Sequence, residues 1–135
     1  MADTITKVER YSVEVPAKAG EGAKLLAALA AGKADLIALW AYPLGKNEKV
    51  ELVPADAAKL KAAAKAAKIK LKRESAAFCV VGRNRIGAVG AAAAKLAEAG
   101  VKIHAAQAIA VGSKFGALVE VDSKDVRKAA KALGV

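Results

Sequence analysis

The sequence passes twice through the same order of expected elements, and this repetition constrains its fold more than any other feature. Each half starts with a segment expected to form a strand, continues through a glycine-containing loop into an alanine-rich helix, and returns to expected strands before a second helix. Gly20 and Gly87 precede the first helix of each half, Leu29 and Leu96 lie within these helices, and each pair is separated by about 67 positions. We therefore expect two tandem structural repeats.

The first repeat contains six expected elements and is assigned to residues 1–75. The pattern predicts strands over 10–16, 35–42, 49–53 and 69–72, and helices over 21–31 and 57–67. Asp56 can cap the second helix. The order β-α-β-β-α-β is typical of a ferredoxin-like unit with an antiparallel sheet.

The second repeat, residues 76–135, follows the same order but lacks the last strand. Strands are expected over 77–81, 101–111 and 115–121, and helices over 88–99 and 123–133. The fold class is therefore α+β, with a βαββαβ and a βαββα repeat. The edge of the strand at 77–81 needs a partner, which is either the segment 4–10 or a second subunit.

Much of the net charge of +10 comes from one run of basic residues. Its members are Lys59, Lys61, Lys65, Lys68, Lys70, Lys72 and Arg73, with no acidic residue among them. The run is either a docking surface for an anionic partner or the solvated side of a helix and its following strand. Amphipathic spacing favours the solvated side.

The segment 36–42 is apolar on both faces of the strand that it is expected to form. Because helices cover only one face of such a sheet, an apolar second face indicates burial against the other repeat or another subunit. Trp40 and Tyr42 are the expected interface anchors. We therefore expect a homo-oligomer, with a dimer as its simplest form.

Catalytic and metal-binding patterns are missing from the sequence. His104 is the only histidine, and Cys79, the only cysteine, lies within an apolar strand where a buried thiol is expected. We expect no enzyme activity, no metal and no cofactor. Since the sequence contains no span of membrane-crossing length and no signal-peptide core, we expect no membrane partner and a cytoplasmic location.

The two loops that precede the first helices resemble those of the ACT family, whose members carry a D-R-P-G-x-L type of loop before the first helix. The second repeat reads Val81-Gly-Arg-Asn-Arg-Ile-Gly87 and the first reads Val15-Pro-Ala-Lys-Ala-Gly20. The usual proline before the glycine is Ala19 in one copy and Ile86 in the other, and the usual acidic residue is absent from both. The resemblance covers nearly the whole chain in two copies.

The resemblance implies a non-catalytic regulatory or sensor protein that binds a small metabolite, with an amino acid as the expected effector. In the family, the effector lies where the loop of one unit faces the second strand of a neighbouring unit, at an inter-repeat or inter-subunit interface. The expected ligand-binding residues are Arg83, Asn84, Arg85, Gly87 and Ala88 in the second repeat, and Lys18 and Gly20 in the first. We expect the better site where the second loop meets the strand that holds Trp40.

Two alternative functions use the same fold. RNA-recognition motifs share its order of strands and helices, but Ala117 and Glu120 occupy positions where base-stacking rings are needed. Specific RNA binding is therefore not expected, although non-specific binding of nucleic acid through residues 59–73 stays open. The other alternative is a protein-interaction partner of an enzyme or a transcription factor.

Overall fold

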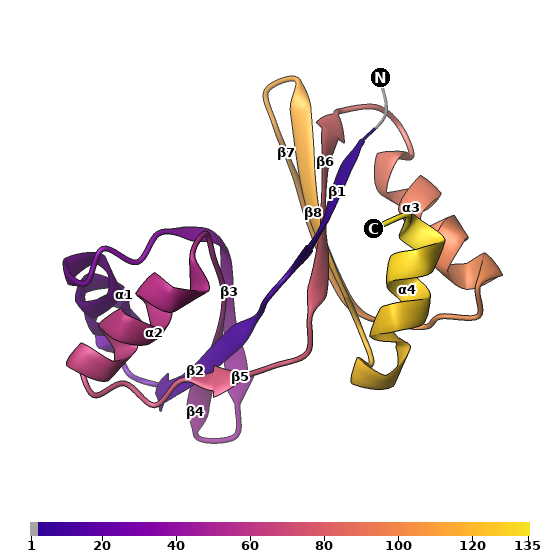
Figure 1. The fold of residues 1–135 in the computed structure, drawn as a ribbon. Helices are drawn as coiled ribbons and strands as arrows, with labels where there is room; N and C mark the ends of the chain where they lie inside the picture. The colour runs from indigo at the N-terminus through magenta and orange to yellow at the C-terminus, as the bar shows by residue number, and fades with distance from the viewer. Residues whose placement is uncertain (1–2) are drawn as a thin grey trace. The chain divides into compact units, whose positions relative to one another are not determined.

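Two sheets of four antiparallel strands form the framework of the computed structural model, which describes residues 3–135 (Figure 1). The inserted unit consists of residues 9–74, and the terminal unit consists of residues 3–8 together with residues 75–135. In each unit the helices pack on one face of the sheet. The α+β class with ferredoxin-like repeats and antiparallel sheets, predicted from the sequence, is confirmed.

The inserted unit has the complete β-α-β-β-α-β order. Its elements are β2 (Tyr11–Pro16), α1 (Glu21–Ala31), β3 (Leu36–Leu44), β4 (Asn47–Pro54), α2 (Ala57–Ala66) and β5 (Lys72–Arg73). The strand order is β3-β4-β2-β5, as expected for a ferredoxin-like sheet. Leu25, Leu29 and Leu60 from the helices pack on Val13 and Leu52 of the sheet to form its core.

The terminal unit is built on the same plan from both ends of the described chain. Its elements are β1 (Thr4–Val8), β6 (Ala77–Arg83), α3 (Ala88–Glu98), β7 (Ile103–Val111), β8 (Lys114–Val121), the short 3-10 helix η1 (Ser123–Asp125) and α4 (Val126–Leu133). The strand order is β1-β6-β8-β7. Phe78, Phe115 and Val119 on the sheet pack against Leu96 of α3 and Leu133 of α4.

The first strand of the chain corrects the predicted domain boundaries of 1–75 and 76–135. β1 pairs with β6, from Thr4 opposite Val81 to Val8 opposite Ala77, and so belongs to the terminal unit. Of the two partners considered for this open edge, the amino-terminal segment is the one observed. Ile5 packs against the terminal core, so this pairing buries apolar surface as well as backbone groups.

The last strand of the inserted unit is shorter than the predicted 69–72. The N–H group of Ile69 donates to the carbonyl of Ala64 at 2.8 Å, which closes the end of α2. Lys68 just before it adopts a left-handed φ of 57°. The chain is therefore still completing the helix at Ile69, and it pairs with β2 only at Lys72 and Arg73.

The amino-terminal end of α2 is capped by a side chain. Asp56 accepts hydrogen bonds from the N–H groups of Ala58 at 3.0 Å and Lys59 at 3.4 Å, so its predicted role as the cap of α2 is confirmed. None of the helices within residues 3–135 is long and apolar enough to cross a membrane.

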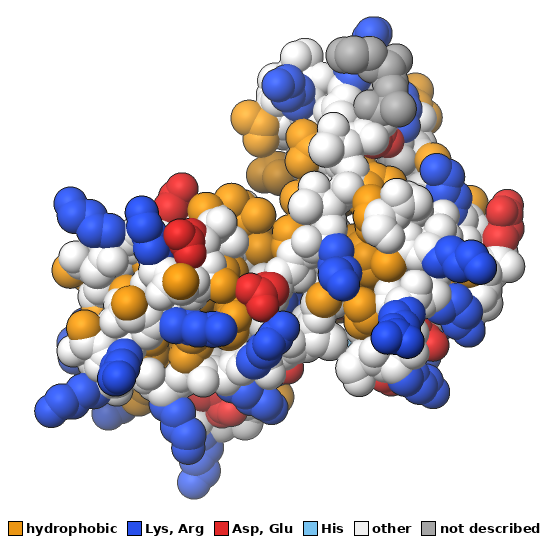
Figure 2. All heavy atoms as spheres, viewed as in Figure 1, with side chains coloured by type: hydrophobic (Ala, Val, Ile, Leu, Met, Phe, Trp, Pro, Cys, Tyr) orange, Lys and Arg blue, Asp and Glu red, His pale blue; other side chains and the backbone are white. Residues whose placement is uncertain are grey.

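Basic side chains are distributed over the viewed surface of both units, with acidic side chains between them (Figure 2). The predicted basic run lies on α2, on the connection that follows it, and on β5. Lys59, Lys61 and Lys65 of α2 are exposed.

The contact between α1 and α2 predicts a difference between two glycine substitutions. A Cβ at Gly32 would lie 2.4 Å from the Cβ of Ala63, so we expect Gly32→Ala to lower the free energy of unfolding by about 1–3 kcal/mol. Gly22 lies within α1 with nothing within 4 Å of an added Cβ, and Gly22→Ala is expected to be stabilising by about 0.5–1 kcal/mol. Urea denaturation measures both, and equal effects would contradict this packing.

Candidate functional site

The loop between β6 and α3 is held by backbone geometry. The N–H group of Asn84 donates to the carbonyl of Ser113 at 2.9 Å, which ties the loop to the β7–β8 turn. Gly87 precedes α3 with a left-handed φ of 78°, a conformation that favours glycine. The N–H group of Ala88 donates to the carbonyl of Arg85 at 3.3 Å. No side chain within residues 3–135 caps α3, so the N–H groups that follow Ala88 in its first turn can face an anionic ligand.

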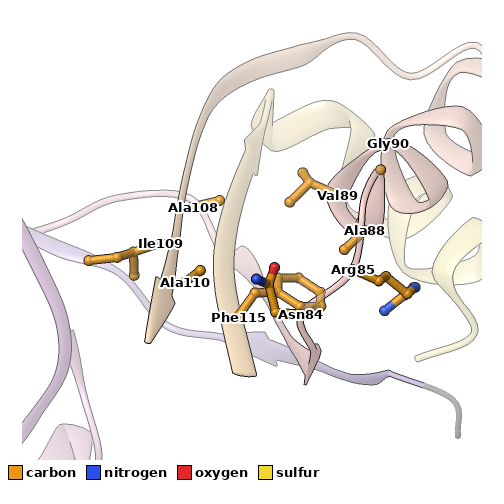
Figure 3. A pocket seen from close by; sticks show the side chains of 10 residues that line it. Asn84, Arg85, Ala88, Val89, Gly90, Ala108, Ile109, Ala110 and Phe115 are labelled. Atoms are coloured by element: carbon orange, nitrogen blue, oxygen red, sulfur yellow. The ribbon is translucent and has the colours of Figure 1, made fainter. Parts of the chain in front are cut away.

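A cavity of about 320 Å³ lies beside this loop, within the terminal unit (Figure 3). Its walls come from the loop, the first turn of α3, the middle of β7 and the start of β8. The lining residues are Asn84, Arg85, Gly87, Ala88, Val89, Gly90, Ala108, Ile109, Ala110 and Phe115. Figure 3 shows the Asn84 side chain beside the Phe115 ring, whereas Arg85 extends away from Asn84 and from β7.

The Arg85 guanidinium already has a carboxylate partner. Its Nη1 and Nη2 donate to Oδ1 and Oδ2 of Asp3 at 3.0 and 2.9 Å, and Nη1 also donates to the carbonyl of Arg83 at 3.1 Å. The hydrogen bonds from Arg85 hold the pKa of Asp3 below its usual value. A ligand carboxylate that approaches Arg85 therefore meets a guanidinium whose charge is largely offset.

Four of the five residues predicted in the second loop line the cavity: Asn84, Arg85, Gly87 and Ala88. Arg83, the fifth, is exposed at the end of β6 and is not part of the lining. Asp3, whose carboxylate offsets the Arg85 charge, was not predicted. No local pattern could reveal it, because 82 positions separate Asp3 from Arg85.

The two residues predicted in the first loop, Lys18 and Gly20, are both exposed. Gly20 precedes α1 with a φ of 90°, so its backbone resembles that of Gly87. A hollow near the start of α1 is lined by Glu21 and Lys24, which form an ion pair at 3.7 Å, but not by Lys18 or Gly20. The structure therefore gives this loop fewer ligand-facing groups than the loop before α3.

The predicted interface anchors lie half-buried on β3. Tyr42 donates from its hydroxyl group to Oε2 of Glu51 at 2.5 Å, and the other oxygen of Glu51 accepts from Arg10. Tyr42 thus has a structural role within the inserted unit. Leu39 is 45% exposed on the helix side of this edge strand, where it lies opposite Leu52, so exposed apolar surface is also present on the face opposite Trp40.

Cys79 and Phe115 bear on two functions that the sequence disfavours, nucleophilic catalysis and specific RNA binding. Burial raises the pKa of the Cys79 thiol, which lowers its thiolate fraction at neutral pH and disfavours a nucleophilic role. Phe115 is 4% exposed and packs in the core beneath the helices. It is therefore not presented on the open face of the sheet, where an RNA-binding module needs its stacking rings.

Comparison with known proteins identifies the fold. No family model matches the chain, and no curated protein matches it. A solved structure of a Bacteroides thetaiotaomicron protein superimposes with a TM-score of 0.81 at 18% identity, covering 96% of this chain and 88% of that one. The ligand-free regulatory subunit of aspartate kinase from Thermus thermophilus gives 0.64 at 15% identity, covering 99% and 95% of the two chains.

The corresponding subunit from Thermus flavus gives a TM-score of 0.63 at 13% identity, again covering 99% of this chain and 95% of that one. Likeness at such low identity reports on the fold, and the aspartate kinase regulatory domains are of the ACT type. This chain therefore has the tandem ACT fold.

Proposed function

We propose that this protein is a non-catalytic regulatory or sensor protein that binds an amino acid in the cavity before α3. The observation that carries the proposal is the convergence of the uncapped α3 N-terminus and the Asn84 side chain on one cavity. Helix N–H groups suit the ligand carboxylate, and an amide can bond to a carboxylate or an ammonium group. The similar aspartate kinase chains are named regulatory subunits, which supports a role without catalysis.

The size and charge of the cavity favour an amino acid over a larger or more highly charged ligand. Its volume of about 320 Å³ is at the lower end of ligand pockets, which span roughly 300–1,000 Å³. The Asp3–Arg85 pair contributes no net charge at its rim. A zwitterion, whose net charge is zero, suits such a rim better than a simple anion does.

The proposal includes a homodimer that pairs along β7. This edge strand is exposed from His104 to Val111, and Ile109 and Val111 are 68% and 69% exposed. Exposed edges present unpaired backbone groups that a second strand can use. Because Ala108 and Ile109 also line the cavity, a second copy on β7 would lie at its mouth.

A thermal-shift screen of the protein-forming amino acids tests this function. At a concentration 100 times its dissociation constant, a ligand that binds only the native state stabilises it by about 2.7 kcal/mol, so at least one amino acid should raise Tm. Asn84→Ala should abolish most of that shift, whereas Arg83→Ala, a change in the same loop but outside the cavity, should preserve it. The proposal is wrong if no amino acid raises Tm at millimolar concentrations.

Replacing Asp3 tests the role of the neutral rim. Asp3→Asn leaves the Arg85 charge uncompensated, so a simple carboxylate should gain about threefold to tenfold in affinity at low salt relative to the amino acid of the same skeleton. Calorimetric titration of both compounds against both proteins measures the ratio. A ratio that does not change would show that Arg85 does not contribute to ligand selection.

The same ion pair predicts a pH dependence of stability. Because the folded pKa of Asp3 is lowered, the pair stabilises the fold above the unfolded aspartate pKa of about 3.9, and this contribution is lost as pH falls through the lowered folded pKa. Asp3→Asn should therefore lose less stability than the wild type between neutral pH and pH ~3. Urea midpoints measure this, and Glu98→Gln, which removes an exposed carboxylate, should follow the wild type closely.

A further inference from the structure

A second cavity, of about 450 Å³, lies in the inserted unit beside α2 and β5. Lys61, Lys65 and Arg73 contribute cations to its wall, whereas Ile69 and Leu71 contribute apolar surface. No acidic side chain is part of the lining. The cavity shares no residue with the one beside α3 and plays no part in the function proposed above.

The backbone brings the three cations together from two elements. Lys61 and Lys65 are four residues apart on α2, a spacing that places like charges on one helix face and is destabilising without a counter-charge. Arg73 reaches the cavity from β5, where its backbone lies opposite Tyr11 of β2. Cations that face a common hollow at this spacing are typical of an anion site.

The charge of the cavity is only partly compensated by the protein. Arg73 contacts Oε1 of Glu9 at 3.1 Å, in a pair whose side chains are 68% and 43% exposed. Within residues 3–135 the structure shows no ion pair for Lys61 or Lys65. Counting Glu9, the cavity therefore has an excess of two positive charges, which balances the two negative charges of a phosphate monoester dianion.

Tyr11 provides an independent observation that points to a ligand. Its side chain is 2% exposed, it forms part of the cavity wall, and its hydroxyl group has no hydrogen-bond partner among the described residues. Buried hydroxyl groups are almost always paired, so an exception calls for a partner. The Lys61 ammonium lies 5.8 Å from the centre of the Tyr11 ring, which places a cation beside this unpaired donor.

We propose that this cavity binds a small organic phosphate. The phosphate group accepts a hydrogen bond from the Tyr11 hydroxyl and pairs with Lys61 and Lys65, while the organic part lies on Ile69 and Leu71. A nucleic acid strand is less suited, because the three cations gather beside one hollow and a buried tyrosine rather than along an extended line. Within the basic run, the site uses Lys61, Lys65 and Arg73, whereas Lys59 and Lys68 lie outside it.

Titration of the full chain with phenyl phosphate at constant ionic strength tests the site. Calorimetry should show binding that Tyr11→Phe weakens about tenfold, since a hydrogen bond to a charged group is lost. Lys61→Gln with Lys65→Gln should abolish it. Lys59→Gln with Lys68→Gln, which removes the same charge from the same segment outside the cavity, should leave the affinity within about twofold, because exposed charges act weakly through screened solvent.

Two control measurements distinguish a phosphate site from a structural tyrosine and from a general basic surface. Tyr11→Phe should not lower the Tm of the unliganded protein, because the hydroxyl makes no internal hydrogen bond; a lowered Tm would overturn its assignment as a ligand donor. The proposal also fails if phenyl phosphate does not bind, or if both lysine pairs weaken it equally. Equal weakening together with binding of oligothymidine would assign the run to non-specific nucleic-acid binding.

Discussion

The pairing of β1 with β6 is the interaction on which the rest of the terminal unit depends. It supplies the fourth strand that residues 75–135 lack, and it places Ile5 against the core. The same pairing extends towards the cavity beside α3, because Thr4 lies opposite Val81 and the residue before it, Asp3, pairs with Arg85. Gly82 makes this approach feasible, since a Cβ there would lie 2.0 Å from Oδ1 of Asp3. The strand that completes the fold therefore also sets the charge at the candidate site.

The inserted unit lowers the entropic cost of this long-range pairing. Strands so far apart in sequence are normally costly to join, because the intervening chain must be ordered as a loop. Here the intervening chain is itself folded, and its two ends are held together. Glu74 donates a backbone hydrogen bond to the carbonyl of Arg10 at 2.9 Å, and Arg73 pairs with Glu9. Once this unit is folded, β1 and β6 leave it as neighbours, and their antiparallel pairing resembles the closing of a hairpin.

Sequence patterns predicted the features that arise from local chemistry. The order of elements, the glycines before α1 and α3, and the Asp56 cap each depend on a few neighbouring residues, and the structure contains all of them. Features that depend on distant partners were not predictable in this way. The pattern of the strand at 77–81 shows an open edge but did not reveal whether the segment 4–10 or a second subunit pairs with it. The shortened β5 was also missed, because the closing hydrogen bond of α2 at Ile69 leaves no periodic signal.

The same distinction between local and distant partners explains how far each of the two cavities could be anticipated from the sequence. The loop, the glycine and the helix start beside the α3 cavity are contiguous in sequence, so a site could be proposed there from the sequence alone. The cavity walls from β7 and β8, and the carboxylate of Asp3, come from distant segments and were not predicted. The cavity beside α2 was not predicted from the sequence. Helical periodicity places Lys61 and Lys65 on a polar face of α2, but it does not show which residues of the sheet lie beside them. Tyr11, which is distant in sequence, changes the interpretation of those lysines by bringing a buried, unpaired hydroxyl group to them.

The two cavities also differ in charge. The carboxylate of Asp3 offsets the Arg85 cation at the cavity beside α3, whereas the cavity beside α2 keeps an excess of positive charge that a neutral amino acid cannot balance. The two proposed sites thus differ in the charge of the ligand that each one suits, and each site lies within a single unit.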